Sequence, residues 1–545
     1  MSDVIVVGAG HNGLVAACYL ARAGLDVLVV ERSAQIGGCT TSGALVPQAP
    51  EHLLNACAAD IITMRSSTVV ADLQLATRFG YREVEIDPAY ALLAPDGSSL
   101  LYWRDPVRTA QEIRRHSPAD ARAYLELMAV FDDVLAVALP MIATNPTRPE
   151  PRALWGALKA AARHPRSVAV MAGLAVASAE QAIRERFSDE LVQSALAVIA
   201  NFGAPITGES TATNLILPAV ISRFGMGRPV GGMGALPAAI ERALRAAGGR
   251  VRTSAPVAEI IIERGRAVGV QLCNGEELRA ARVLTATEPY GALHDLLPAD
   301  ALSARDAARV AAIPCDNDGC THFKIEMAFR GRLALDRHQA ARSDTVDLRI
   351  PSAMVGSIDE VVAAIGAARG GRMPDPLPFV SMIPTAADPT QAPAGMDTLS
   401  LWSGWLPHHP PGGWPSAKAT VEQAFVAHAA RYFDGIEQLE IGRAVETPEE
   451  ISDRTGVRNG NVYHVDVTLT RLGPLRPALG FGGYRTPVPG LYITGAGTHP
   501  GPSVSGIPGQ QAARTILRDV RRSGAGPAPR TWHAQAPIPA PEVLV

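Results

Sequence analysis

The chain opens on a pattern that few folds accommodate: a short strand, a glycine-rich turn, a helix and a second strand. Residues 4–7 are a β-branched apolar run, and residues 8–13 follow as G-x-G-x-x-G. Residues 14–23 have helical composition and stop before Gly24, after which residues 27–30 form another apolar run. This order predicts a βαβ unit with two parallel strands.

Each glycine of the turn has a separate physical task. Gly8 permits the tight turn out of the strand, Gly10 lets the backbone approach a pyrophosphate, and Gly13 allows the helix to pack closely on the strand. Glu31 lies 18 residues after Gly13, where a carboxylate accepts hydrogen bonds from adenosine ribose hydroxyls and disfavours a 2′-phosphate. The alternative is a structural βαβ unit with Glu31 on the surface; the combined context favours a dinucleotide site.

Two further segments favour FAD over NAD. Gly37-Gly38 lies six residues after Glu31, and such a pair recurs in flavoproteins where the backbone passes close to the pyrophosphate. Residues 490–497, Gly-Leu-Tyr-Ile-Thr-Gly-Ala-Gly, predict a strand entering small residues near the ribityl chain and flavin. The residues expected to bind FAD are Gly8, Gly10, Gly13, Glu31, Arg32, Gly37, Gly38, Val257, Gly495 and Gly497.

Composition excludes several other classes of protein. The 50 basic and 53 acidic residues give a net charge of -3 and no basic field for nucleic acid. The longest apolar stretch outside the motif, residues 167–178, is too short for a membrane span, which needs roughly 20 residues. Six dispersed cysteines suit a reducing compartment. Because the first strand is predicted to begin beside Met1, we expect no secretory signal peptide before it. We therefore expect a cytoplasmic protein.

A chain of 545 residues exceeds what one hydrophobic core usually serves, so two domains are expected. The local pattern changes from sheet to helix near residue 81, returns to sheet near residue 224, and ends in a strand, glycine loop and helix. We predict a Rossmann-type α/β FAD-binding domain interleaved with an α+β substrate domain. The FAD-binding domain comprises residues 1–80, 224–300 and 481–522. The substrate domain comprises residues 81–223 and 301–480, and residues 523–545 form a flexible tail.

Several segments carry a family resemblance, namely residues 3–14, 30–38, 230–236, 460–477 and 484–501. In these segments the chain resembles the phytoene desaturase and carotenoid oxidoreductase superfamily. Within it, the chain is most similar to the group called pyridine nucleotide-disulfide oxidoreductase domain-containing protein 2. The resemblance implies an amine-oxidase-like fold, noncovalent FAD, an inserted substrate domain, and a reaction that dehydrogenates, saturates or isomerises an apolar polyene.

The chain also departs from these relatives. Residues 285–288, Thr-Ala-Thr-Glu, stand where many flavoproteins have Ala-Thr-Gly, and Gly497 stands where many place an acid toward the ribityl chain. Cys39 follows the glycine pair, at a position where the sequences of carotenoid desaturases differ from this one. Residues 50–60 are more polar than we expect for a long polyene channel. We therefore expect an apolar or amphipathic small molecule and do not restrict it to a carotenoid.

No second redox or nucleotide site is expected. Cys315 and Cys320 flank residues 316–319, which predict a turn, and we interpret them as isolated core cysteines. The glycine cluster at residues 225–234 follows no buried strand in the sequence pattern, so we expect it to shape a loop beside FAD. Electrons would then leave the reduced flavin to oxygen, a quinone or another protein.

The candidate catalytic residues are His464, His499 and Arg476, all near the C-terminal flavin segments. Either imidazole could move a proton at neutral pH, although a structural role is the alternative because hydride transfer to flavin needs positioning more than a base. Arg476 could neutralise reduced flavin or a substrate anion, or form a surface ion pair. No metal site is expected: His408-His409 has no further ligands at suitable spacing.

One Ala/Leu/Val-rich stretch carries basic residues at intervals. These are Arg152, Lys159, Arg163 and Arg166. One interpretation is a helix that lies on an anionic membrane surface and gives access to a lipid-borne substrate. The other, which we favour from sequence, is an amphipathic helix that covers the substrate domain.

The sequence therefore predicts an FAD-dependent oxidoreductase that transfers hydride from an apolar or amphipathic small molecule to flavin N5, leaving a C=C bond. A redox-neutral flavin-dependent isomerase or saturase, and a non-catalytic flavoprotein acting through protein partners, are the alternatives.

Overall fold

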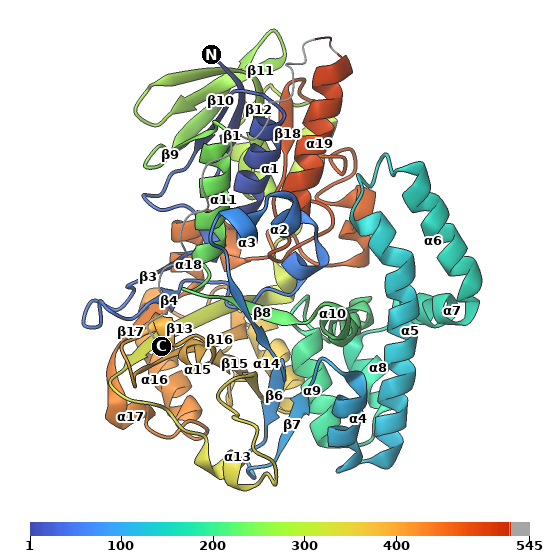
Figure 1. Ribbon diagram of the computed structural model, residues 1–545, viewed down its shortest axis with the longest axis vertical. Helices are drawn as coiled ribbons and strands as arrows, with labels where there is room; N and C mark the ends of the chain where they lie inside the picture. Colours follow the sequence, from blue (N-terminus) through green and yellow to red (C-terminus); the bar gives the residue numbers. More distant parts are fainter. Residues whose placement is uncertain (523, 525–545) are drawn as a thin grey trace.

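Two seven-stranded sheets organise the computed structural model, which describes residues 1–522 and 524 (Figure 1). The first sheet has the order β10-β11-β12-β1-β2-β9, and β18 also pairs with β12. Its strands are β1 (Ser2–Val7), β2 (Val27–Val30), β9 (Arg250–Arg252), β10 (Val257–Glu263), β11 (Arg266–Leu272), β12 (Glu277–Thr285) and β18 (Leu491–Ile493). Apart from residue 524, the predicted tail lies outside the described residues.

The predicted βαβ unit forms the centre of the first sheet. β1 pairs in parallel with β2 and β12, and β12 in turn pairs in parallel with β18. The helix between the strands, α1 (His11–Arg22), begins directly after Gly10, three residues earlier than predicted. With α11 (Ala235–Ala246) and α19 (Ile507–Arg522), α1 covers one face of the sheet (Figure 1). The Rossmann-type fold is therefore confirmed.

The second sheet has the order β17-β13-β16-β15-β14-β6-β7. Its strands are β6 (Tyr90–Leu93), β7 (Ser99–Tyr102), β13 (Cys320–Phe329), β14 (Ser352–Val355), β15 (Phe379–Met382), β16 (Asp397–Pro407) and β17 (Glu440–Glu446). The sequence pattern suggested only short strands here, but β13 and β16 have 10 and 11 residues. Both are almost wholly buried, so no exposed residues mark their length in the sequence.

Helices cover both faces of the second sheet and extend along one side of the molecule (Figure 1). The helices of the segment between β7 and β8 are α4 (Pro106–Arg114), α5 (Pro118–Ile142), α6 (Pro151–Arg163), α7 (Pro165–Leu174), α8 (Ala179–Arg186), α9 (Glu190–Ala200) and α10 (Leu217–Phe224). The remaining helices are α2 (Val69–Asp72), α3 (Leu75–Arg78), α12 (Ala304–Ala311), α13 (Asp336–Ala340), α14 (Ile358–Arg369), α15 (Pro384–Ala387), α16 (Trp414–Ala429), α17 (Ile436–Leu439) and α18 (Pro448–Thr455). Within residues 1–522, none of them is long and apolar enough to cross a membrane.

Residues 178–200 carry apolar residues at helical spacing throughout, but a buried carboxylate divides this stretch into α8 and α9. Asp120 accepts hydrogen bonds from the backbone N–H groups of Ser188 and Asp189, which draws the chain out of the helix. Asp189 then caps α9 by accepting from the N–H of Val192. A tertiary contact therefore overrides a continuous helical pattern.

The glycine cluster at residues 225–234 contains a buried strand, which its last three glycines follow, contrary to the expectation from sequence. This strand, β8 (Met226–Pro229), pairs antiparallel with β5 (Glu83–Ile86) in a two-stranded sheet of its own. Two backbone N–H groups after β8 already donate hydrogen bonds to side chains. The N–H of Met233 donates to Asn55 Oδ1 at 2.8 Å, and the N–H of Gly234 donates to Ser42 Oγ at 2.8 Å. These groups are therefore engaged within the protein.

The close contact between α1 and α19 leads to the first prediction. A Cβ at Gly509 would lie 2.1 Å from the carbonyl oxygen of Asn12, in the first turn of α1. Gly509→Ala should push α19 away from α1, cost about 2 kcal/mol of stability, and lower both the thermal midpoint and the FAD content of the purified protein. Circular dichroism and the flavin absorbance measure these two effects.

Gly366→Ala is the matched control. Gly366 lies in α14 with no atom within 4 Å of its added Cβ, so alanine should leave the midpoint unchanged or raise it slightly. Equal midpoints for the two variants would contradict the packing argument.

Candidate cofactor and substrate site

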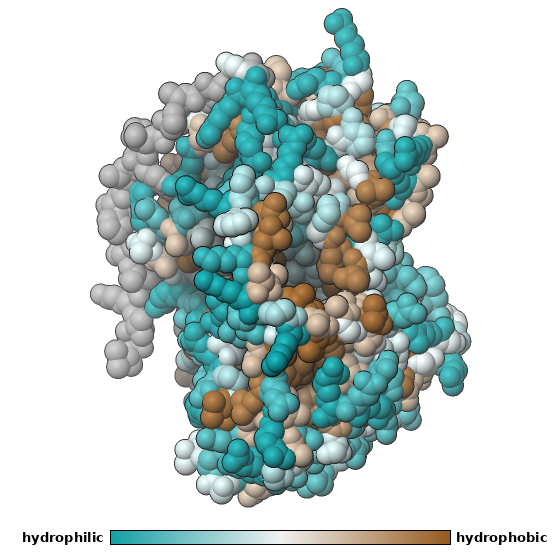
Figure 2. All heavy atoms as spheres, turned by 90° about the vertical axis from the view of Figure 1, so that its right-hand side faces the viewer, coloured by the Kyte–Doolittle hydropathy of each residue, from teal (hydrophilic) through white to brown (hydrophobic). Residues whose placement is uncertain are grey.

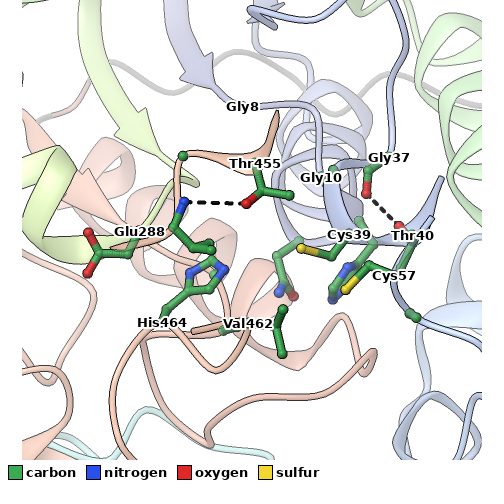
Figure 3. A pocket seen from close by; sticks show the side chains of 18 of the residues that line it. Gly8, Gly10, Gly37, Cys39, Thr40, Cys57, Glu288, Thr455, Val462 and His464 are labelled. Atoms are coloured by element: carbon green, nitrogen blue, oxygen red, sulfur yellow. Dashed lines mark hydrogen bonds between the residues drawn. The ribbon is translucent and has the colours of Figure 1, made fainter. Parts of the chain in front are cut away.

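One cavity of about 800 Å³ joins the two sheets, a size typical of ligand sites. The glycine turn after β1 and Glu31 line one part, and side chains of the second sheet line another. In Figure 3, Gly37, Cys39 and Cys57 lie on one side of this cavity, and Glu288 and His464 lie on the other. The cavity is therefore shared between the two halves of the fold.

Glu31 is fixed by the backbone at the end of β2. Its Oε2 accepts a hydrogen bond from the N–H of Ala9 at 2.8 Å, and its Oε1 accepts from the N–H of Ser33 at 2.9 Å. The residue is only 8% exposed, yet it lines the cavity. Each carboxylate oxygen keeps acceptor capacity, so the group is preorganised for a neighbouring pair of hydroxyls.

The glycines of the turn differ in what surrounds them. A Cβ at Gly10 would meet nothing within 4 Å, because that side of the residue faces open space. A Cβ at Gly13 would lie 2.1 Å from the carbonyl oxygen of Gly8, so the helix and the turn pack too closely for any other residue. Gly10 forms a bridge with Gly37, which brings the glycine pair beside the first turn of α1. The result is a bare backbone cradle at the N-terminus of a helix.

Eight of the ten predicted cofactor residues line the cavity: Gly8, Gly10, Glu31, Arg32, Gly37, Gly38, Val257 and Gly495. Gly13 and Gly497 lie behind its wall. A Cβ at Gly497 would approach Pro289 to 2.3 Å, which explains why this chain has no acid at that position.

Glu288, the other departure from the usual flavoprotein pattern, makes a buried contact between segments. It pairs with Arg458 Nη2 at 3.3 Å and accepts from the N–H of Gly291 at 2.8 Å. Burial raises the pKa of this carboxyl group, and Arg458 lies over the ring of Tyr290 at 3.8 Å from its centroid. Glu288 thus ties the end of β12 to the segment after α18.

Unpaired polar atoms around the cavity fit a polar ligand. His11 Nε2, Asn12 Oδ1, Thr287 Oγ1 and His464 Nδ1 are buried without a hydrogen-bond partner, and all four residues line the cavity. Buried polar groups are normally paired, so these atoms point to a ligand with donors and acceptors. A dinucleotide with a heterocyclic ring system meets this requirement, and FAD therefore fits the residues present.

The two candidate histidines have different positions. His464 lines the cavity, has a left-handed backbone with φ 63°, and is half-buried; desolvation of its ring lowers the pKa of its imidazole to about 3. His499 lies outside the cavity lining and approaches the carbonyl oxygen of Met141 at 3.4 Å. Burial lowers the pKa of His499 to about 4. Both rings are therefore neutral at neutral pH.

Arg476 is completely buried and does not line the cavity, so neither a direct substrate contact nor the surface ion pair fits its position. Its guanidinium donates to the backbone carbonyls of Tyr463, Val465, Asp466, Arg471 and Ala496. Burial lowers its pKa to about 9. Arg476 therefore ties the segment that carries His464 to the loop after β18.

The part of the cavity formed by the second sheet is aromatic. The ring centroids of Tyr90 and Phe202 lie 5.6 Å apart, and those of Phe202 and Trp402 lie 5.9 Å apart. His322 stacks on the other side of Trp402 at 5.2 Å. We call Tyr90, Phe202 and Trp402 the aromatic wall; all three line the cavity.

Sequence reasoning missed two charged residues beside this wall. Lys324 and Glu326 on β13 are each 4% exposed in their side chains and form an ion pair at 2.8 Å. Lys324 lines the cavity and lies opposite Trp402 in the β13–β16 pairing. Lys324 and Glu326 alternate with the apolar residues Phe323 and Ile325, and this alternation was an available signal because alternate strand residues share one face. Within residues 1–522, no group of three or more His, Cys, Asp or Glu side chains is arranged to hold a metal ion.

Comparison with known proteins agrees with this geometry. The family described as flavin containing amine oxidoreductase matches residues 13–349. Pyridine nucleotide-disulfide oxidoreductase domain-containing protein 2 of Rattus norvegicus is 27% identical, covering 95% of this chain and 94% of the relative. All-trans-zeta-carotene desaturase of Myxococcus xanthus is 27% identical over 96% of this chain and 94% of the relative.

The fold has solved counterparts. Cyclohexylamine oxidase from Brevibacterium oxydans has a TM-score of 0.58 at 17% identity, covering 96% of this chain and 100% of that structure. The predicted resemblance, amine-oxidase-like fold and FAD cofactor are confirmed by these findings together. The chain is an FAD-dependent oxidoreductase that belongs to the flavin-containing amine oxidoreductase family.

Proposed function

We propose that the protein dehydrogenates an apolar or amphipathic small molecule by transferring a hydride to bound FAD. The observation that carries this proposal is the aromatic wall, which belongs to the same cavity as the dinucleotide turn and Glu31. Tyr90, Phe202 and Trp402 offer large apolar faces that bind hydrocarbon and exclude water. When bound, FAD supplies a two-electron acceptor at N5 of its ring system.

In this proposal the nucleotide is held by the backbone and by Glu31. The N–H groups at the start of α1 and the open side of Gly10 receive the pyrophosphate, and the carboxylate of Glu31 receives the ribose hydroxyls. Arg32, Gly37, Gly38, Val257 and Gly495 complete the cofactor contacts. With FAD bound, these contacts would hold the ring system on the side of the cavity that the aromatic wall lines, so hydride transfer would depend on positioning.

The charged and basic groups of the cavity suit such a reaction. Lys324 donates to Glu326 and to the backbone carbonyls of Asn55 and Cys57, which uses all three hydrogens of its ammonium group. Its positive charge is therefore held in place. His464 is neutral and only weakly basic, so its ring can hydrogen-bond a ligand but holds no proton to donate as an imidazolium ion.

The pKa of His464 predicts a pH effect on stability. The folded pKa of about 3 lies below the ordinary value of 6.5, so unfolding takes up a proton below pH 6.5 and stability falls as the pH decreases toward 3. His464→Gln should remove this dependence, which amounts to about 3 kcal/mol at pH 4. Thermal midpoints measured from pH 7 to pH 4 should fall less steeply for the variant than for the wild-type protein. His409→Gln, in an exposed loop position, is the control, and three parallel curves would contradict the prediction.

Glu31 provides a direct test of the nucleotide contacts. In Glu31→Gln the amide nitrogen cannot accept an N–H and the charge toward the ribose is lost. FAD should bind about tenfold more weakly, a change of about 1.4 kcal/mol, measured by flavin fluorescence during titration of the apoprotein. Glu277→Gln, an exposed change on β12, should bind FAD like the wild-type protein. Unchanged affinity in Glu31→Gln would remove this residue from the site.

Anaerobic reduction of the purified yellow protein tests the proposed reaction. NADH, NADPH and a panel of apolar alcohols, amines and polyenes are added separately, and the flavin absorbance is followed. Bleaching by a panel compound but not by a nicotinamide supports the dehydrogenase and defines its substrate class. Re-oxidation by oxygen, a quinone or an added protein then identifies the electron acceptor.

The same experiment separates the alternatives. Bleaching by a nicotinamide alone identifies a reductase and contradicts the proposal. Conversion of a polyene only after chemical prereduction of the flavin identifies an isomerase or saturase. Normal cellular function of Gly10→Val, provided that it folds without flavin, identifies a non-catalytic flavoprotein.

We further propose that the face carrying α6 and α7 contacts a membrane peripherally, which would give access to a lipid-borne substrate. Leu154, Trp155 and Leu158 on α6 are 44%, 71% and 54% exposed, so most of its apolar face is uncovered. Figure 2 shows apolar residues gathered across the middle of this face. The other exposed large apolar residues on α7 and in the loops are Val168, Val170, Val176, Leu469, Leu475 and Leu479. Arg152, Lys159, Arg163 and Arg166 add positive charge for anionic lipids.

Vesicle binding tests this face. Trp155→Ser/Leu158→Ser should bind vesicles containing phosphatidylglycerol at least tenfold more weakly than the wild-type protein, because two large apolar side chains are lost. Val107→Ser, exposed on α4, is the control and should bind like the wild-type protein. Cosedimentation at low and high salt provides the measurement. Equal binding by all three proteins, or binding by none, would exclude this membrane contact.

A further inference from the structure

Two cysteines meet in the wall of the cavity. Cys39 directly follows the glycine pair, and Cys57 follows β4 (Leu54–Asn55). β4 pairs with β3 (Ser42–Gly43), and the pairing continues toward the cysteines, where Ala58 donates its N–H to the carbonyl of Cys39 at 2.9 Å. This ladder brings the side chains of Cys39 and Cys57 to the same part of the cavity wall, and both line the cavity (Figure 3).

Charged residues from three elements surround the pair. Lys324 on β13 donates to the carbonyl of Cys57 at 3.0 Å, and Arg454 on α18 donates to the carbonyl of Ala56 at 3.3 Å. Their carboxylate partners are Glu326 and Glu446, on β13 and β17. The two cations therefore lie beside the thiols, and each is held in place by its own ion pair.

The two thiols are not equivalent. The neighbouring Cys39 thiol, with Lys324 and Arg454 acting in the same direction against burial, lowers the pKa of Cys57 to about 7. The neighbouring Cys57 thiol and burial raise the pKa of Cys39 well above its ordinary value. Cys57 is therefore the thiol of the pair that deprotonates more readily, and Cys39 is the thiol that keeps its proton.

The buried cysteines elsewhere in the described chain provide a contrast. Burial raises the pKa of Cys315 to about 11 and that of Cys320 to about 12, which makes both unreactive at neutral pH. Cys18 is also buried, and its pKa is raised further. Cys273 lines the cavity and is exposed, but it has no partner cysteine in the described chain.

We propose that Cys39 and Cys57 form a redox-active dithiol that reacts with a hydroperoxide entering the cavity. A thiol that is accessible, flanked by cations and next to a second thiol has the arrangement of a peroxide-sensing pair. Oxidation would connect the turn after the glycine pair covalently to the end of β4. The redox state of the pair would then control the mobility of the cavity lining that lies between the cofactor turn and the aromatic wall.

The reaction balances in two steps. The Cys57 thiolate attacks one oxygen of the hydroperoxide, so that an S–O bond forms, the O–O bond breaks, and the leaving oxygen takes up a proton as an alcohol or water. Cys39 then attacks the sulfenic acid of Cys57, so that the S–S bond forms, the S–O bond breaks and water leaves. The two thiols together lose two electrons, and the hydroperoxide gains two.

Peptide mapping of the FAD-loaded protein tests this proposal without substrate or turnover. One equivalent of hydrogen peroxide is added, free thiols are alkylated, and the protein is digested. Residues 33–65 contain no Lys or Arg before Arg65, so trypsin leaves both cysteines on one peptide. Additional cleavage after Glu51 separates residues 33–51 from residues 52–65 unless a disulfide joins them. We expect the joined pair after peroxide and two separate peptides after later reduction with dithiothreitol.

Single variants assign the two roles, with flavin absorbance as the measure of folding. Cys39→Ser should accumulate a sulfenic acid on Cys57 that dimedone traps, whereas Cys57→Ser should show no modification at Cys39. Cys273→Ser, the matched control in the same cavity, should form the disulfide like the wild-type protein. Full alkylation of Cys39 and Cys57 after peroxide treatment, or a sulfenic acid on Cys39 in Cys57→Ser, would overturn the proposal.

Discussion

The site depends on one short-range constraint, the close packing of the first turn of α1 against the turn that leaves β1. Gly13 lies so close to the carbonyl of Gly8 that no side chain fits between them. The N–H of Ala9, in the same turn, donates to Glu31 at the end of β2. Backbone and carboxylate therefore hold each other in place before any ligand binds, and binding FAD requires little reorganisation at this end of the cavity.

Contacts between residues far apart in sequence then position the second sheet beside this turn. Arg228 on β8 is almost fully buried, pairs with Asp60 at 2.7 Å and donates to Ser352 Oγ on β14 at 2.9 Å. Lys324 connects β13 to the segment after β4 in the same way. Because such buried charges are costly unless paired, these contacts allow few alternative arrangements of the two sheets. The aromatic wall is consequently held at a fixed place relative to the cofactor turn.

The sequence was most informative where a local pattern has one physical explanation. The βαβ unit, the glycine turn and Glu31 could be predicted because each depends on neighbours within about 30 residues. Arg476 was harder to interpret, because its five backbone partners follow from how two loops fold over it. Cys39 and Cys57 are 18 residues apart with no spacing motif, and only the β3–β4 pairing brings them together. The aromatic wall likewise combines residues from three distant segments.

The central claim is that one cavity holds FAD at the glycine turn and presents its ring system to the aromatic wall. A crystal structure of the FAD-loaded protein tests this claim most directly. We predict electron density for the adenosine ribose within hydrogen-bond distance of the Glu31 carboxylate, and for the flavin ring in the cavity that Trp402 lines. Density for the flavin ring outside this cavity, or for the ribose away from Glu31, would contradict the account.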